Sequence, residues 1–236
     1  MHKLMTGNEA VARGAFEAGC MVATAYPGTP STEILENVAT YQEIYSQWSP
    51  NEKVAVEVAC GASVGGSRAL SVMKVVGLNV AMDPLMTFSY LGANGGLVIV
   101  VADDPGCSSS QTEQDNRLIA PFAKIPLFEP SDSQECKDYI KHAFQVSEQY
   151  GTPVLFRMTT RVCHSKGIVK LGNRVEAAVK EYVKTGNYCS TPALARKKHA
   201  KLEEKLIKLE EYANNCPLNK IEWGSKDTGI IASGIS

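Results

Sequence analysis

Glu52 and the small residues that follow it form the most specific chemical pattern in this 236-residue chain. A helix is expected over residues 51–68, with the Glu52 carboxylate in its first turn, where the helix dipole favours negative charge. Glycine and alanine recur along it, at positions 55, 59, 61, 62, 65 and 66. Because each glycine costs a helix up to about 1 kcal/mol relative to alanine, such a helix is expected where another backbone or a flat ligand approaches closely. Glu52 is therefore either a simple dipole partner or a group placed beside a ligand.

The same helix contains Gly61-Ala62-Ser63-Val64-Gly65, which matches the G-x-S-x-G sequence of serine hydrolases. In those enzymes the serine stands on a sharp turn between a strand and a helix. Here the five residues lie inside a helical pattern, with no strand directly before them. A hydrolase with Ser63 as nucleophile is thus the least favoured alternative, and it would predict labelling by a fluorophosphonate probe.

Residues 26–32, Tyr-Pro-Gly-Thr-Pro-Ser-Thr, connect an expected strand to an expected helix. The turn lacks the G-x-G-x-x-G pattern of dinucleotide-binding proteins. Thr29 and Pro30 are expected to be the N-cap and first residue of a helix that runs through Val38, which places the Thr29 hydroxyl at a helix N-terminus. Simple capping and contact with a ligand both stay open for this turn.

A second loop, over residues 103–111, follows the apolar run Leu-Val-Ile-Val-Val-Ala at 97–102. It is rich in hydroxyl groups and turn-forming residues, and ligands bind beyond the carboxyl ends of such strands. A solvated surface loop is the alternative. The acidic residues in and after this loop have no known cation-loop spacing, so no metal site is expected.

The elements that position these loops alternate along the first 160 residues. Apolar runs are expected to form strands at residues 21–25, 45–48, 69–75, 97–102 and 153–158. Helical patterns lie between them, at residues 7–18, 29–38, 51–68, 79–90 and 131–150. This alternation predicts an α/β fold, a doubly wound parallel sheet with helices on both faces.

The chain is expected to have three parts. Residues 1–165 form the sheet domain, and residues 166–226 form a polar linker with a helix at about 193–214. Residues 227–236 contain a short apolar run followed by Ser-Gly, so they are interpreted as the first strand of a following, missing domain.

Composition narrows the possible functions. The balance of 24 basic and 25 acidic residues argues against a nucleic-acid partner, because binding phosphates requires a basic face. No apolar run reaches the roughly 20 residues of a membrane span, and no signal peptide is apparent. The seven cysteines form no C-x-x-C pair, which argues against a zinc or iron–sulfur site in this chain. A cytoplasmic protein is expected.

Taken together, these residues resemble the N-terminal domain of the α subunit of indolepyruvate ferredoxin oxidoreductases, which depend on thiamine diphosphate. The blocks that carry the resemblance are Gly7-Asn8-Glu9-Ala10 with Ala12-Arg13-Gly14, residues 26–31, residues 51–63, residues 103–106, and Ser109, Gln111 and residues 113–117. Residues 77–80 and 229–231 fit as well, so the resemblance covers nearly the whole chain.

The resemblance implies a thiamin diphosphate-binding fold of the pyrimidine type, with Glu52 as the catalytic group. In that class a glutamate in the first turn of a small-residue helix hydrogen-bonds N1′ of the aminopyrimidine and promotes the tautomer that deprotonates the thiazolium. Glu52 has the matching offset from Gly61, whereas Glu57 does not. The resemblance also assigns cofactor contacts to Pro27, Gly28, Gly77 and Asn79, and substrate contacts to Thr29, Ser109, Ser110 and Gln111.

The same resemblance implies that the chain supplies half of a site. The Gly-Asp-Gly motif that holds Mg²⁺ and the diphosphate is not in this sequence, so a diphosphate-binding domain is expected in cis or on a second chain, within a homodimer or a heteromeric complex. Iron–sulfur clusters, coenzyme A and ferredoxin belong to the complete enzyme, which would convert arylpyruvates such as indolepyruvate to acyl-CoA by oxidative decarboxylation. The isolated chain is expected to bind the cofactor weakly and to be inactive.

Two further interpretations stay open. One is an α subunit of another 2-oxoacid ferredoxin oxidoreductase or of a 2-oxoacid decarboxylase. The other is a non-catalytic scaffold subunit that kept the fold without the chemistry. The sequence does not reveal which 2-oxoacid is preferred.

Overall fold

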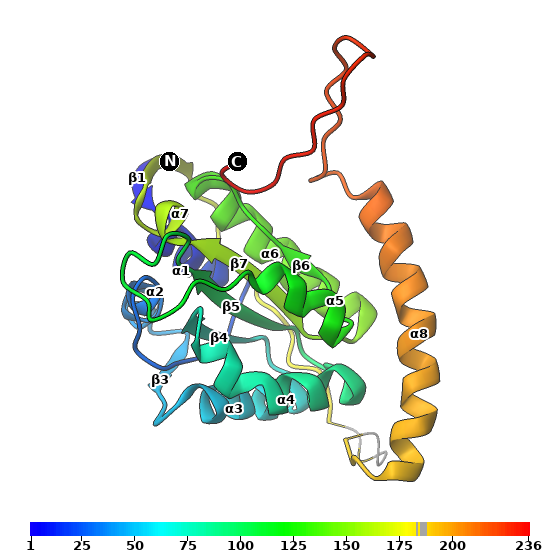
Figure 1. The fold of residues 1–236 in the computed structure, drawn as a ribbon. Coiled ribbons are helices and arrows are strands. Elements are labelled where there is room, and N and C mark those ends of the chain that lie inside the picture. Colours follow the sequence, from blue (N-terminus) through cyan, green and yellow to red (C-terminus); the bar gives the residue numbers. More distant parts are fainter. Residues whose placement is uncertain (183, 185–187) are drawn as a thin grey trace.

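A six-stranded parallel sheet, in the order β3-β2-β4-β5-β7-β6, forms the centre of the computed structural model, which describes residues 1–182, 184 and 188–236 (Figure 1). The strands are β2 (Val22–Ala25), β3 (Tyr45–Trp48), β4 (Ala69–Lys74), β5 (Leu97–Asp103), β6 (Leu127–Phe128) and β7 (Val154–Thr159). Every residue of β5 and β7 is buried, as expected for strands that are covered on both faces. The five strands predicted within residues 1–165 and the parallel, doubly wound sheet are confirmed, and β6 is an additional short strand.

Helices cover both faces of this sheet and form two separate cores. One core contains residues of α1 (Gly7–Glu17), α2 (Thr32–Val38) and α6 (Ser133–Tyr150). The other contains residues of α3 (Glu52–Val64), α4 (Gly77–Leu91) and α5 (Ile119–Ala123). Figure 1 shows α3 and α4 together on the lower side of the sheet.

Side chains cap the starts of α1 and α3. Thr6 and Glu9 form a capping box at α1, and Asn51 caps α3 through its bond to the Val54 amide. The prediction that Thr29 caps the next helix is wrong, because α2 begins at Thr32. The amide of Gly28 donates to the hydroxyl of Thr32, so the turn closes before the helix begins and leaves Thr29 exposed.

The end of α3 also differs from the prediction. The helix stops at Val64, not at residue 68. Gly66 adopts a φ of +94°, and a right-handed helix cannot continue through a residue with a positive φ. Glycine tolerates this conformation best because it has no Cβ. Residues 67–68 then lead directly into β4.

Residues 166–170, which the sequence places in the linker, belong to the sheet domain. They form β8 (Lys166–Lys170), which pairs antiparallel with β1 (His2–Thr6) in a two-stranded sheet. The amide of Gly172 then donates to the buried carboxylate of Glu17, which also pairs with Arg13 and Lys137. The boundary at residue 165 is therefore too early, because backbone pairing and a buried ion cluster hold the next residues against the domain.

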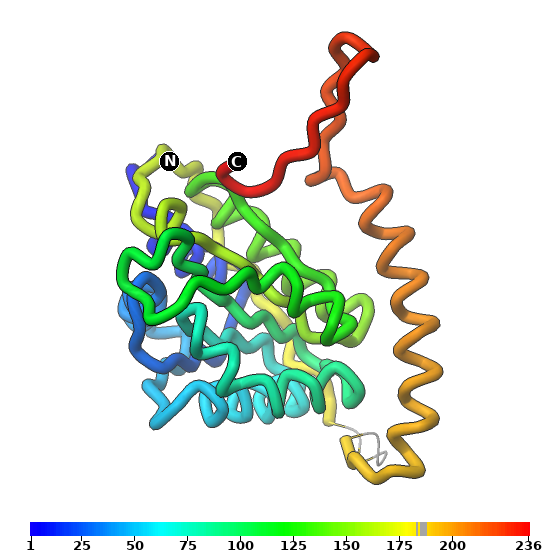
Figure 2. The backbone as a smooth tube through the Cα atoms, in the orientation of Figure 1, coloured from blue at the N-terminus to red at the C-terminus, as the bar shows by residue number. Residues whose placement is uncertain are grey.

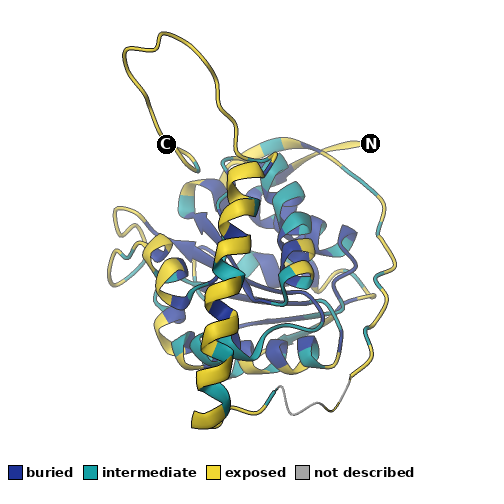
Figure 3. Cartoon of the chain, turned by 90° about the vertical axis from the view of Figure 1, so that its right-hand side faces the viewer, coloured by how far each residue is buried: buried dark blue, intermediate teal, exposed yellow. Residues whose placement is uncertain are grey.

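The long helix α8 (Pro192–Asn215) confirms the helix expected at about 193–214. It packs through Leu202 and Leu209 and exposes most of its other residues (Figure 3). Beyond it the chain leaves the body and returns toward the side where the N-terminus lies (Figure 2). The strand expected in residues 227–236 is not formed: Ile230 and Ile231 are 89% and 101% exposed and have no neighbouring strand to pair with.

No described helix is both long and apolar enough to cross a bilayer. Within the described ranges, histidine, cysteine and acidic side chains form no group of three that could hold a metal ion.

The packing of α1 on α6 generates a matched pair of glycine substitutions. A Cβ at Gly14 would collide with the Ile140 side chain and the Lys137 carbonyl, whereas a Cβ at Gly61 would meet nothing within 4 Å. Gly14→Ala should lower the free energy of unfolding by about 1–3 kcal/mol through overpacking, and Gly61→Ala should raise it by up to about 1 kcal/mol. Denaturant titration measures both. Equal effects of the two substitutions would contradict the packing described here.

Candidate active site

The carboxyl end of β4 is the point where three loops meet. Lys74 is the last residue of this strand, and β4 lies between β2 and β5 in the sheet. The turn after β2, the loop after β5 and the start of α4 therefore all lie at the same edge. Topology alone thus gathers most of the site residues predicted from the sequence.

Glu52 lies at the N-terminus of α3, where it is only 6% exposed. Its carboxylate has no hydrogen-bond or ion-pair partner among the residues that the structure describes. Three residues earlier, the buried hydroxyl of Ser49 likewise has no partner. Buried polar groups are nearly always hydrogen-bonded, so this turn offers an acceptor and a hydroxyl that the chain itself leaves unused.

Gly77 provides the space that Glu52 occupies. A Cβ at this first position of α4 would lie 2.6 Å from Oε1 and 2.7 Å from Cγ of Glu52. Any residue larger than glycine would therefore displace the carboxylate. The structure brings these two predicted site residues together.

Lys74 connects two other predicted residues. Its aliphatic chain covers Gly28, where a Cβ would lie 2.8 Å from the lysine Cδ, and its Nζ donates to Oε1 of Gln111 at 3.2 Å. Sequence reasoning missed this lysine. The sequence feature that could have identified Lys74 is its position as a basic residue at the carboxyl end of a strand whose other residues are buried.

The loop of Ser109 and Ser110 is held by Asp104. Oδ2 of this carboxylate accepts the two serine amides at 2.6 and 2.9 Å, and Oδ1 accepts the Thr160 hydroxyl at 2.7 Å. Burial would raise the pKa of Asp104, but the bonds from Ser109, Thr160 and Ser110 outweigh it and lower the pKa to about 2. The carboxylate therefore stays ionised and fixes the backbone of the loop.

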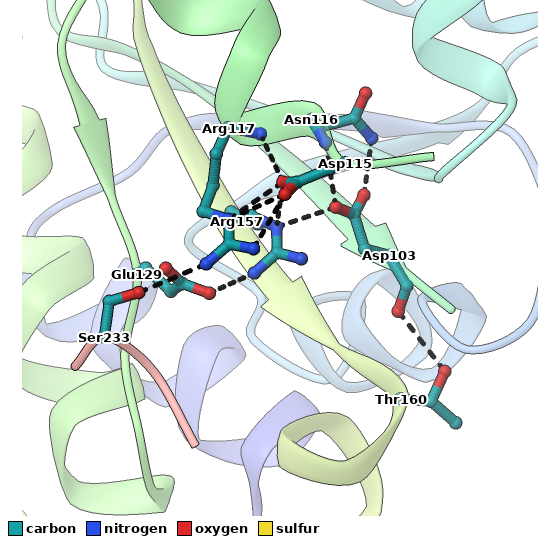
Figure 4. Close-up of polar contacts among 8 residues, drawn as sticks. All are labelled: Asp103, Asp115, Asn116, Arg117, Glu129, Arg157, Thr160 and Ser233. Atoms are coloured by element: carbon teal, nitrogen blue, oxygen red, sulfur yellow. Dashed lines mark hydrogen bonds and ion pairs between the residues drawn. The ribbon is translucent and has the colours of Figure 1, made fainter. Parts of the chain in front are cut away.

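A buried ionic network braces the base of the same loop (Figure 4). Asp103 accepts from Arg157 Nε at 2.7 Å and from the Asn116 amide at 3.0 Å. Arg157 also pairs with Glu129. Burial raises the pKa of Asp103 in spite of these bonds. The network joins β5, β7 and the segment after β6.

Three predicted contacts are exposed and make no side-chain hydrogen bond within the described ranges. Pro27 and Thr29 lie in the turn after β2, and Asn79 lies in the first turn of α4. Their assignments stay predictions. The hydrolase alternative is wrong, because Ser63 is fully buried within α3 and its hydroxyl donates to the carbonyl of Gly95 at 2.5 Å.

The arrangement fits a flat, nitrogen-containing ring. An unpartnered carboxylate can accept a hydrogen bond from a ring nitrogen or share a proton with it. Gly28 and Gly77 leave space at this edge that the side chains of Lys74 and Glu52 occupy, and the Lys74–Gln111 hydrogen bond ties the loop of residues 109–111 to the same place. These features are consistent with an aminopyrimidine beside Glu52.

Comparisons with known proteins show the family to which the chain is similar. Residues 13–208 match the family model described as pyruvate flavodoxin/ferredoxin oxidoreductase, thiamine-diphosphate-binding. The chain is 49% identical to the indolepyruvate oxidoreductase subunit IorA of Archaeoglobus fulgidus, over 98% of this chain and 39% of the relative. It is 50% identical to the same subunit of Pyrococcus abyssi, over 99% of this chain and 38% of the relative.

More distant similarities extend the comparison. The 2-oxoglutarate synthase subunit KorA of Methanothermobacter marburgensis is 28% identical over 72% of this chain and 48% of its own length. The solved 2-oxoglutarate:ferredoxin oxidoreductase of Magnetococcus marinus has the same fold, with a TM-score of 0.72 and 18% identity over 89% of this chain and 45% of that chain. The chain thus spans about two fifths of the length of these two IorA relatives, 39% of one and 38% of the other.

The contact between Gly77 and Glu52 predicts a specific coupling. Gly77→Ala should destabilise the chain by about 1–3 kcal/mol, because the new methyl group overlaps the carboxylate. In a Glu52→Ala background the same substitution should cost at least about 1 kcal/mol less. A double-mutant cycle by denaturant titration measures this difference, and additive effects would show that the two residues do not constrain each other.

The depressed pKa of Asp104 predicts a pH dependence with a defined sign. Its folded-state pKa of about 2 lies below the ordinary value of 3.8, so its contribution to stability is fully present above about pH 4 and is lost as the pH falls toward 2. Asp104→Asn should remove this contribution at neutral pH and speed hydrogen exchange of the Ser109 and Ser110 amides. If exchange at those amides is unchanged in the variant at pH 6, Asp104 does not hold the loop.

Proposed function

This chain belongs to the thiamine-diphosphate-binding family of pyruvate flavodoxin/ferredoxin oxidoreductases, and on that premise we propose that it forms the pyrimidine-binding half of a thiamine diphosphate site in an indolepyruvate:ferredoxin oxidoreductase. The observation that carries the proposal is the buried Glu52 carboxylate, which lacks a partner and lies against Gly77. High identity to IorA subunits over nearly the whole chain supports indolepyruvate rather than 2-oxoglutarate as the substrate of the complete enzyme.

In this proposal each residue has a role toward the cofactor or the substrate. Bound thiamine diphosphate would supply the carbon nucleophile and the electron sink that decarboxylation of a 2-oxoacid requires. Glu52 hydrogen-bonds N1′ of the aminopyrimidine and holds or shares a proton there. Gly28, Gly77, Pro27 and Asn79 bound the ring, and Thr29 with residues 109–111 faces the 2-oxoacid.

The other half of the site would come from a second domain, in cis or on a partner chain, in a homodimer or a heteromeric complex. Gly61 is exposed on α3, and nothing in the described chain lies within 4 Å of the position of its missing Cβ. A helix that gives up stability for such a glycine is consistent with close approach of the domain that binds Mg²⁺ and the diphosphate. Iron–sulfur clusters, coenzyme A, ferredoxin and a cytoplasmic location are proposed for the complete enzyme only.

Glu52→Gln in the complete enzyme tests the catalytic assignment. The amide keeps the shape but cannot share a proton in the same way, so turnover should fall by about 10²–10⁴-fold, with an unchanged or slightly higher midpoint of thermal unfolding. Glu57→Gln is the matched control, because it is exposed one turn further along the same helix and pairs only weakly with Lys53 at 4.0 Å. Near-normal turnover in the Glu52 variant would remove the assignment, and so would equal losses in both variants.

The half-site proposal also predicts how the chain behaves alone. Titration calorimetry with thiamine diphosphate and Mg²⁺ should give no binding tighter than millimolar to the 236-residue chain, because this chain is proposed to contact only the pyrimidine. Micromolar binding that depends on Mg²⁺ would show that the diphosphate site lies in this chain after all.

A further inference from the structure

A cavity opens at the same edge of the sheet, and Glu52 does not line it. It has a volume of about 630 Å³ and is lined by Pro105 and Ser108 of the loop after β5, by Thr159 and Arg161 at the end of β7, and by Ile235 of the C-terminal tail. This volume lies within the roughly 300–1,000 Å³ of small-molecule sites. No residue assigned above to the cofactor or the substrate lines it.

Arg161 gives the cavity an unused positive charge. The residue lies in the short helix α7 (Thr160–His164) and is exposed. No carboxylate among the described residues comes within 4.0 Å of its guanidinium, and that group makes no hydrogen bond in the described part of the chain. The other basic side chain in the wall, His164, faces Glu33, with 3.9 Å between Nε2 and Oε1.

Thr159 adds a buried hydroxyl that has no partner. The residue is 7% exposed, lines the cavity, and makes no hydrogen bond through Oγ1 within the described residues. Its neighbour Thr160 differs, because that hydroxyl donates to Asp104. Leaving a buried hydroxyl unpaired is unfavourable, and a bound acceptor group would recover that cost.

We propose that this cavity binds the anionic oxygen group of a small molecule, through the Arg161 guanidinium and the Thr159 hydroxyl. Guanidinium groups favour carboxylates and phosphates, which accept two parallel hydrogen bonds. Pro105 and Ile235 provide apolar walls for the remainder of the ligand. If the proposed function holds, two sources supply such a group: the carboxylate of an aryl 2-oxoacid and the phosphates of coenzyme A.

The test is a set of NMR titrations of the full 236-residue chain. Sodium phenylpyruvate, coenzyme A and inorganic phosphate are added separately, and the backbone amides of residues 159–165 and the Arg161 Nε–H are followed. At least one probe should shift these signals saturably, and Arg161→Gln should weaken that binding at least tenfold. Arg196→Gln, an equal charge change at an exposed residue of α8, should change the affinity less than twofold.

Thr159→Val separates binding from a structural role. The substitution removes the hydroxyl and keeps the shape, so it should weaken probe binding at least threefold without lowering the thermal midpoint of the ligand-free chain. A lower midpoint together with unchanged affinity would show that the hydroxyl is structural and would overturn its role here.

The three probes also distinguish the sources. Saturation by phenylpyruvate but not by coenzyme A would identify a carboxylate subsite, and the reverse would identify a phosphate subsite. No saturable shift with any probe, or an affinity that Arg161→Gln leaves unchanged, would overturn the proposal. Failure of the Glu52 assignment would appear only in turnover, so the two proposals can fail independently.

Discussion

The site depends on a buried carboxylate that the chain leaves without a partner. Removing a carboxylate from water without compensating hydrogen bonds is costly, and the local sequence makes this arrangement possible. Asn51 starts the helix that carries Glu52, and Gly77 leaves the space into which its side chain extends. A chain that folds only to form a scaffold gains nothing from this arrangement, whereas a ligand that hydrogen-bonds the carboxylate would recover its cost.

Rigid loops surround that carboxylate. The two serine amides bound to Asp104 and the ionic network of Asp103 and Arg157 fix the loop after β5 at both ends. Lys74 then links this loop to the turn at Gly28. Loops that are already held in place position a bound substrate at a smaller entropic cost. The side chains that hold these loops need not touch the substrate themselves.

Local patterns predicted the elements well, and long-range contacts explain where they failed. The apolar strand of residues 97–102 and the helix starts at residues 7 and 51 all depend on neighbouring residues, and the structure agrees with them to within one residue. The cap at Thr29 was wrong because the turn is closed by a bond between Gly28 and Thr32. The strand at 166–170 was missed because it depends on pairing with β1, more than 150 residues away in the chain.

The candidate site follows the same division. Glu52, Gly77 and Gln111 were proposed from the family resemblance of their local sequence blocks, and parallel topology places their loops at one edge. Lys74, Arg157 and Asp104 were not, since their importance comes from partners on other strands. Single-sequence reasoning sees which residues could do chemistry, but not which side chains hold them in place.

The most direct test is a structure of the complete enzyme with thiamine diphosphate and Mg²⁺ bound. The account predicts that a Glu52 carboxylate oxygen lies about 2.6–3.2 Å from N1′ of the aminopyrimidine, with the ring against the backbone of Gly77. An aminopyrimidine whose N1′ contacts a different residue, with Glu52 still unpartnered, would contradict it.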